Sequence, residues 1–186
     1  MRLDRPIGWW LLLLPGWWAI LISAHNLSDA FRLMCLFMLG AIVMRAAGCV
    51  INDMWDTDID RKIARTSTRP LASGEISSTQ AWVTLTLLAS IGLLVLLALP
   101  VKAWLMGIAA LPFVALYPAF KRFTYWPQAM LGLTFSWGIF LGHVAAQNEW
   151  PDPLMVTLYL GTVFWVIGYD TIYAIQDMED DEKTGV

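Results

Sequence analysis

The stretch AFRLMCLFMLGAIVMRAAGCVINDMWDTDIDR, residues 30–61, contains the two features that decide the fold. Its first part, Ala30–Ile51, is apolar apart from two arginines. A helix needs about 20 such residues to cross a bilayer. Its second part, Asn52–Arg61, carries four aspartates directly after the apolar part. A membrane helix followed by a dense acidic segment predicts a membrane protein with polar chemistry at one surface of the bilayer.

Composition extends this interpretation to the whole chain. Of 186 residues, 58% are hydrophobic and 15% are charged, whereas a soluble domain has about a quarter charged residues. We therefore predict an all-α fold, a polytopic transmembrane helical bundle. No repeat or linker indicates a second domain, so we expect one transmembrane domain over residues 1–186. Six apolar tracts are candidate membrane helices: Trp9–Ala24, Ala30–Ile51, Thr79–Leu99, Ala103–Ala119, Ala129–Ala146 and Leu154–Ile175.

The basic residues predict how the bundle is oriented. Only Arg32 and Lys102 lie near one side of the predicted membrane, and the connection Asn148–Asp152 on that side has no basic residue. Because basic residues concentrate on the cytoplasmic side, we expect a multi-pass protein with a cytoplasmic N-terminus. The other side carries nine basic residues: Arg2, Arg5, Arg61, Lys62, Arg65, Arg69, Lys121, Arg122 and Lys183.

The first acidic cluster has helical spacing. We expect Asn52–Ile63 to continue the second helix beyond the membrane. Asn52, Asp56 and Asp60 then recur every four residues and share one face, with Asp53 beside them. Close carboxylates repel each other unless a cation or solvent neutralises them. The pattern therefore indicates a cation site, although a solvated charged loop beside a membrane is the common alternative.

A second acidic cluster begins within the sixth tract and continues beyond its end. Its first member, Asp170, lies inside the tract, where ionisable residues are rare and are usually functional. Arg45 lies at similar depth in the second tract. The remaining members continue at helical spacing: Tyr173, Asp177, Asp180 and Asp181.

Two carboxylate faces on the same side of a membrane could hold Mg²⁺ together with a diphosphate. Mg²⁺ prefers oxygen ligands and is commonly shared between carboxylates and substrate phosphates, and it stabilises the charge on a leaving phosphate. Nearby basic residues could bind the remaining phosphate oxygens: Arg65, Arg69, Lys121 and Arg122. A calcium loop beginning at Asp56 fits poorly, because Arg61 replaces its turn glycine and Ser67 its final glutamate.

Two acidic motifs and four further blocks of sequence resemble one family. The motif N-D-x-x-D-x-x-x-D is matched by Asn52, Asp53, Asp56 and Asp60, and D-x-x-x-D by Asp177 and Asp181. The further blocks are Met44–Cys49, Arg65–Leu71, Tyr117–Arg122 and Tyr169–Ala174. In these residues the chain resembles the UbiA superfamily of intramembrane prenyltransferases, especially its 4-hydroxybenzoate branch in ubiquinone biosynthesis.

The resemblance implies a fold and a reaction. The fold is a bundle with an expected nine helices, of which this chain supplies six, so we expect the C-terminal part to be missing. The reaction is the Mg²⁺-assisted transfer of a polyprenyl group from polyprenyl diphosphate to the ring of 4-hydroxybenzoate. The implied partners are these two substrates and the lipid bilayer. Nucleic acid is not expected.

The resemblance also implies a role for each site residue. The metal ligands would be Asn52, Asp53, Asp56, Asp60, Asp177, Asp180 and Asp181, with Asn52 also touching diphosphate. Arg69, Lys121 and Arg122 would bind phosphate oxygens. Tyr117 and Tyr173 would stabilise positive charge at the allylic carbon. Arg45 would pair with the carboxylate of the aromatic acid or with diphosphate, and Asp170 would orient the phenol or Tyr173.

Other interpretations remain open. Relatives that prenylate haem, homogentisate or a naphthoate share the acidic motifs. A proton-coupled transporter would explain Asp170 and Arg45, but it would not need acidic clusters outside the hydrocarbon. We expect His25 and His143 to be non-catalytic and Cys35 and Cys49 to be packing residues. Because no presequence rich in arginine and serine is evident, we expect a bacterial cell inner membrane.

Overall fold

The computed structural model describes residues 6–63, 66–123 and 126–184, without the side chains of residues 115, 117–123 and 176–184. These residues form helices and turns and contain no strand, which confirms the all-α prediction. The helices are α1 (Ile7–Ser23), α2 (Leu27–Trp55), α3 (Thr57–Asp60), α4 (Ser78–Leu97), α5 (Val101–Phe123), α6 (Pro127–Ser136), α7 (Gly138–Gln147) and α8 (Pro153–Thr184).

The six predicted tracts correspond to the six long helical units, with α6 and α7 forming one of them. Four segments are long and apolar enough to cross a membrane: Leu27–Trp55, Ser78–Leu97, Pro127–Gln147 and Pro153–Ile175. Two others, Ile7–Ser23 and Val101–Val114, are apolar but shorter. The sequence Ser77-Ser78-Thr79-Gln80 predicts a capping box at the start of α4. The capping box is present, because Ser77 Oγ accepts from Gln80 N and Ser77 N donates to the Gln80 side chain.

Close packing of α1 against α7 places α1 inside the bundle. A Cβ atom added to Gly142 would lie 2.6 Å from the carbonyl oxygen of Gly16, and one added to Gly138 would lie 3.1 Å from Gly16 N. Small residues let membrane helices approach in this way. Beside this contact, Ile20, Leu33 and Val144 form a buried apolar core.

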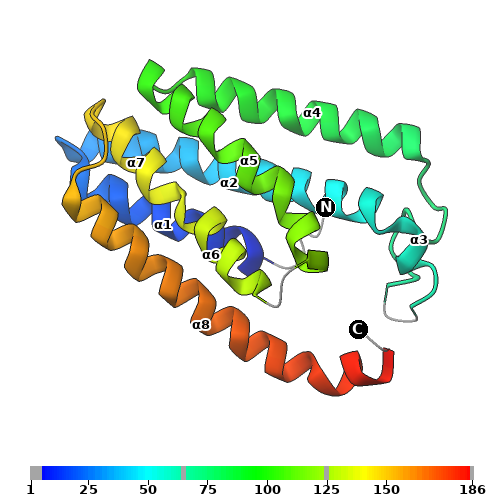
Figure 1. Cartoon of the computed structure of the whole chain (residues 1–186). Coiled ribbons are helices and arrows are strands. Elements are labelled where there is room, and N and C mark those ends of the chain that lie inside the picture. Colours follow the sequence, from blue (N-terminus) through cyan, green and yellow to red (C-terminus); the bar gives the residue numbers. More distant parts are fainter. Residues whose placement is uncertain (1–5, 64–65, 124–125, 185–186) are drawn as a thin grey trace.

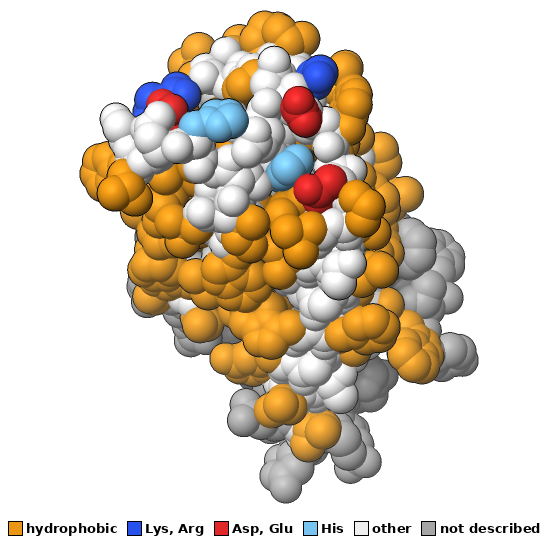
Figure 2. Space-filling model, turned by 90° about the vertical axis from the view of Figure 1, so that its left-hand side faces the viewer, with side chains coloured by type: hydrophobic (Ala, Val, Ile, Leu, Met, Phe, Trp, Pro, Cys, Tyr) orange, Lys and Arg blue, Asp and Glu red, His pale blue; other side chains and the backbone are white. Residues whose placement is uncertain are grey.

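The helices lie side by side, and their connections gather at two ends (Figure 1). We call the end formed by α3, residues 61–77 and the last turns of α5 and α8 the acidic end. The opposite end consists of the connections at residues 24–26, 98–100 and 148–152. Figure 2 looks toward this opposite end, where a few charged side chains lie above a largely hydrophobic surface. Both acidic segments of the sequence therefore leave the bundle at the same end, as predicted.

Candidate functional site

A break in the helix shapes the acidic end. We predicted that α2 would continue to Ile63, and this is wrong: α2 ends at Trp55, and the short helix α3 begins after Asp56. The hydroxyl of Thr57 donates to the carbonyl oxygens of Asp53 (2.7 Å) and Met54 (3.1 Å), so the side chain competes with the helical bonding of the backbone.

The predicted acidic face survives this break. Asp56 N still donates to Asn52 O (2.9 Å), and Asp60 N to Asp56 O (2.8 Å). The three residues thus keep their spacing of one turn, although they belong to α2, the junction and α3. Asn52 and Asp56 are half-buried and Asp60 is buried, whereas Asp58 is exposed on the other side of α3. These three residues of the motif N-D-x-x-D-x-x-x-D are therefore less exposed than Asp58, which the motif does not include.

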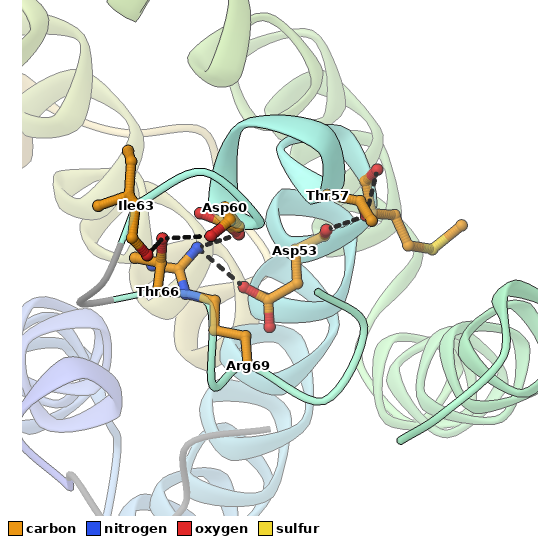
Figure 3. Close-up of polar contacts among 7 residues, drawn as sticks. Asp53, Thr57, Asp60, Ile63, Thr66 and Arg69 are labelled. Atoms are coloured by element: carbon orange, nitrogen blue, oxygen red, sulfur yellow. Dashed lines mark hydrogen bonds and ion pairs between the residues drawn. The ribbon is translucent and has the colours of Figure 1, made fainter. Parts of the chain in front are cut away.

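Asp53 and Asp60 converge on Arg69 (Figure 3). Arg69 Nη1 lies 2.6 Å from Asp60 Oδ2 and 3.4 Å from Asp53 Oδ1. Their side chains are 5% (Asp60), 14% (Asp53) and 23% (Arg69) exposed. The hydroxyl of Thr66 donates to Asp60 O (3.1 Å) and ties the turn that carries Arg69 to α3. Two shielded carboxylates therefore point at one cationic atom.

This arrangement fits a cation site, because carboxylate oxygens that converge on a guanidinium group can also bind a divalent ion. Among the residues whose side chains are described, no three His, Cys, Asp or Glu residues lie close enough to hold a metal. The other predicted ligands, Asp177, Asp180 and Asp181, lie outside the described side chains, as do Tyr117, Lys121 and Arg122. The helices that carry these residues, α5 and α8, end on the same side as α3 (Figure 1).

A second feature is a cavity of about 230 Å³ among α1, α2, α6 and α8. It brings together Arg45 of α2 with Asp170 and Tyr173 of α8. Apolar residues from α1 and α6 complete the wall, including Leu11, Leu131 and Phe135. The cavity thus combines a basic and an acidic side chain with apolar walls, as small-molecule sites commonly do.

Among the cavity residues that sequence reasoning missed, Tyr169 and Gly8 contact other functional or aromatic side chains. Tyr169 lines the cavity, and its ring stands edge-on to Trp165 at 5.1 Å between centroids. Gly8 of α1 lies under Arg45: a Cβ atom there would be 2.8 Å from Arg45 Nε. No sequence pattern indicates Gly8, because its contact with Arg45 joins two helices. Tyr169 stands next to Asp170, but it lacks the charge that drew attention to its neighbour.

The remaining titratable candidates belong neither to the contact of Asp53 and Asp60 with Arg69 nor to the cavity lining. His143 Nδ1 is 2.8 Å from Ser23 Oγ in the buried contact between α7 and α1, and Gln147 Nε2 donates to Ser23 O. His25 is exposed in the turn between α1 and α2. Cys35 and Cys49 are both free thiols of α2. None of the four lines the cavity that contains Arg45.

Comparison with known proteins identifies the family. The model of the UbiA prenyltransferase family matches residues 12–186. The chain belongs to this family. It is 50% identical over 187 residues to the mitochondrial 4-hydroxybenzoate polyprenyltransferase of Drosophila pseudoobscura pseudoobscura, covering 100% of this chain and 47% of that protein. The enzyme of the same name from Rattus norvegicus is 47% identical and is covered over 50% of its length. This UbiA chain spans about half the length of these relatives.

Solved structures agree on the fold. A UbiA homologue from Aeropyrum pernix K1 superposes with a TM-score of 0.75 at 28% identity, over 100% of this chain and 68% of that one. A UbiA homologue from Archaeoglobus fulgidus, bound to DMAPP and Mg²⁺, gives 0.72 at 25% identity, over 99% of this chain and 65% of that one. Members of the family thus bind a prenyl diphosphate together with Mg²⁺.

The comparison corrects one prediction. We expected a bacterial inner membrane, but these relatives at 47–50% identity are mitochondrial enzymes of eukaryotes, so that expectation is wrong. It depended on the lack of a presequence. That lack is uninformative in a chain that spans half the length of its relatives. The multi-pass character of the protein is unaffected.

Proposed function

We propose that the protein containing this UbiA chain transfers a polyprenyl group from polyprenyl diphosphate to the ring of 4-hydroxybenzoate, a step of ubiquinone biosynthesis. The observation that carries the proposal is the convergence of Asp53 and Asp60 on one cation at the end of the bundle where α8 also ends. The relatives named 4-hydroxybenzoate polyprenyltransferase support the acceptor.

The acidic end would hold the donor. Mg²⁺, when bound, supplies positive charge that stabilises the departing diphosphate. Its ligands would come from the first motif (Asn52, Asp53, Asp56 and Asp60) and from the end of α8 (Asp177, Asp180 and Asp181). Arg69, Lys121 and Arg122 would bind phosphate oxygens, because guanidinium and ammonium groups pair well with phosphate.

The cavity would hold the acceptor. Arg45 would bind the carboxylate of 4-hydroxybenzoate, and Asp170 would accept a hydrogen bond from its phenol. Tyr173, which lines the same cavity, and Tyr117 would face the allylic carbon with their electron-rich rings. The apolar walls would exclude water, which would otherwise capture the reactive prenyl group.

The bonds of this reaction balance without an oxidant. The C1–O bond of the prenyl diphosphate breaks and the diphosphate leaves with the electron pair. The ring carbon ortho to the phenol forms a bond to C1, and the proton on that carbon is lost. The chain's residues hold both substrates in register and keep the site dry, which is how enzymes lower barriers of this kind.

The test uses membranes that contain the full-length protein. They are incubated with radiolabelled 4-hydroxybenzoate, a polyprenyl diphosphate and Mg²⁺, with and without a chelator. We expect a lipid-soluble labelled product that the chelator abolishes. If folded, inserted protein makes no such product, the proposal fails for this acceptor. Ion-dependent uptake into vesicles without a covalent product would instead indicate a transporter.

A further inference from the structure

Arg69 already occupies the position between two proposed metal ligands. One atom, Arg69 Nη1, lies 2.6 Å from Asp60 Oδ2 and 3.4 Å from Asp53 Oδ1. Both carboxylates are shielded from solvent, at 5% and 14% side-chain exposure. Two carboxylates held this close in a shielded place need a cation between them. In this structure the guanidinium group is that cation (Figure 3).

A divalent ion and this guanidinium group cannot share the position. Like charges repel strongly at such distances when solvent is largely excluded. An ion entering alone would have to displace Arg69 and would offer the guanidinium group no new anionic partner. An ion entering with a diphosphate brings such a partner, because phosphate oxygens accept two parallel hydrogen bonds from arginine.

We propose that Arg69 keeps bare divalent metal away from Asp53 and Asp60 and releases them only when a diphosphate arrives to take its guanidinium group. The inference rests on the proposed function, since it takes these aspartates as ligands of a metal–diphosphate complex. It makes Arg69 a positioning residue as well as a phosphate ligand. Metal and diphosphate would consequently bind together rather than metal first.

The place of Arg69 in the fold allows this exchange. Arg69 lies in the turn region between α3 and α4, outside any helix, and its side chain is 23% exposed. The turn itself is held by hydrogen bonds that the exchange need not disturb: Thr66 Oγ1 donates to Asp60 O at 3.1 Å, and Arg69 N donates to Thr66 O at 2.9 Å. The guanidinium group can therefore move while the main chain stays in position.

The test measures Mn²⁺ binding to the purified full-length protein without any diphosphate, by the electron paramagnetic resonance signal of free Mn²⁺. We expect Arg69→Gln to bind Mn²⁺ at least about tenfold more tightly than wild type, because its two aspartates then lack their resident cation. Arg61→Gln is the matched control. Arg61 is a neighbouring arginine that contacts exposed Asp58 (3.5 Å) and Ala72 O (3.3 Å) but neither Asp53 nor Asp60.

Equal or weaker Mn²⁺ binding by Arg69→Gln, or equal tightening by Arg61→Gln, would overturn the inference. Since Arg69→Gln removes the guanidinium group between two shielded carboxylates, it is purified in Mn²⁺ and then stripped with chelator. Aggregation on stripping, absent from wild type and Arg61→Gln, supports the inference, whereas aggregation with Mn²⁺ still present contradicts it. Product formation by wild type is assayed separately, so failure of the proposed function is distinguishable from failure of this inference.

Discussion

At the acidic end, Asp53 and Asp60 face each other across Arg69, whereas at the opposite end Ser23 is joined to His143 and Gln147 by hydrogen bonds. These two hydrogen bonds tie α1 to α7. The charged arrangement is energetically costly, because shielded carboxylates need compensating positive charge. We infer from this difference that the acidic end serves chemistry and that the opposite end serves helix packing. The cavity that Arg45 and Asp170 line combines both characters, because its lining includes charged and apolar side chains.

The largest expected effect is at the acidic end. Asp60→Asn should lower the rate of product formation at least about 100-fold, because a buried metal ligand loses its charge. The measurement is labelled product per inserted protein at saturating substrates. Asp58→Asn is the matched control, since Asp58 lies two residues away on α3 with its side chain 90% exposed. Equal losses in both variants would contradict a specific role for Asp60.

The second effect concerns the cavity. Arg45→Ala should raise the KM for 4-hydroxybenzoate by about 10- to 100-fold, the range expected when a carboxylate loses a charged hydrogen-bond donor. The KM for the prenyl diphosphate should change little. Arg32→Ala removes an exposed arginine near the other end of α2 and serves as the control. A raised KM for the diphosphate alone would instead place Arg45 with the donor.

A smaller effect is expected at Gly8. A methyl group there would push the Arg45 side chain from its position, since the added Cβ would lie 2.8 Å from Nε. Gly8→Ala should raise the acceptor KM about three- to tenfold, the cost of a distorted rotamer, with kcat nearly unchanged. At Gly161 of α8 an added Cβ meets nothing within 4 Å, so Gly161→Ala is the matched control. Similar kinetics for Gly8→Ala and wild type would show that Arg45 does not depend on this contact.

Substitutions at the opposite end should change the stability of the protein rather than its turnover. His143→Ala removes the buried partner of Ser23 and leaves a cavity, which should cost about 1–3 kcal/mol of unfolding free energy. Thermal unfolding in detergent measures this change, and turnover below the transition should stay near wild type. His25→Ala, at an exposed turn, should leave the unfolding temperature unchanged. A loss of turnover without a loss of stability would mean that His143 takes part in the reaction.

The sequence predicted features that depend on local spacing. The apolar tracts matched the long helices within a few residues at most ends, and the capping box of Ser77 and Gln80 was correct. The charged residues at membrane depth, Arg45 and Asp170, were grouped correctly, because such residues rarely face lipid. These predictions succeeded because each depends on residues within a few turns or on the solvent that surrounds them.

Features set by contacts between distant segments were missed. The break at Trp137 between α6 and α7 accompanies the approach of Gly138 and Gly142 to Gly16, which no local pattern reveals. The end of α2 at Trp55 was missed for a different, local reason, because Thr57, a residue that helices usually tolerate, donates its hydroxyl back to Asp53 O. The contact of Arg69 with Asp53 and Asp60 spans a turn whose path the sequence leaves undetermined.

The central claim is that the acidic end holds the metal and the diphosphate. Anomalous X-ray scattering from crystals of the full-length protein, grown with Mn²⁺ and an unreactive prenyl thiolodiphosphate, tests it most directly. The account predicts a manganese peak within bonding distance of Asp60, with Arg69 turned from the aspartates toward the phosphate oxygens. Manganese bound elsewhere, or Arg69 still between Asp53 and Asp60 with the diphosphate present, would contradict it.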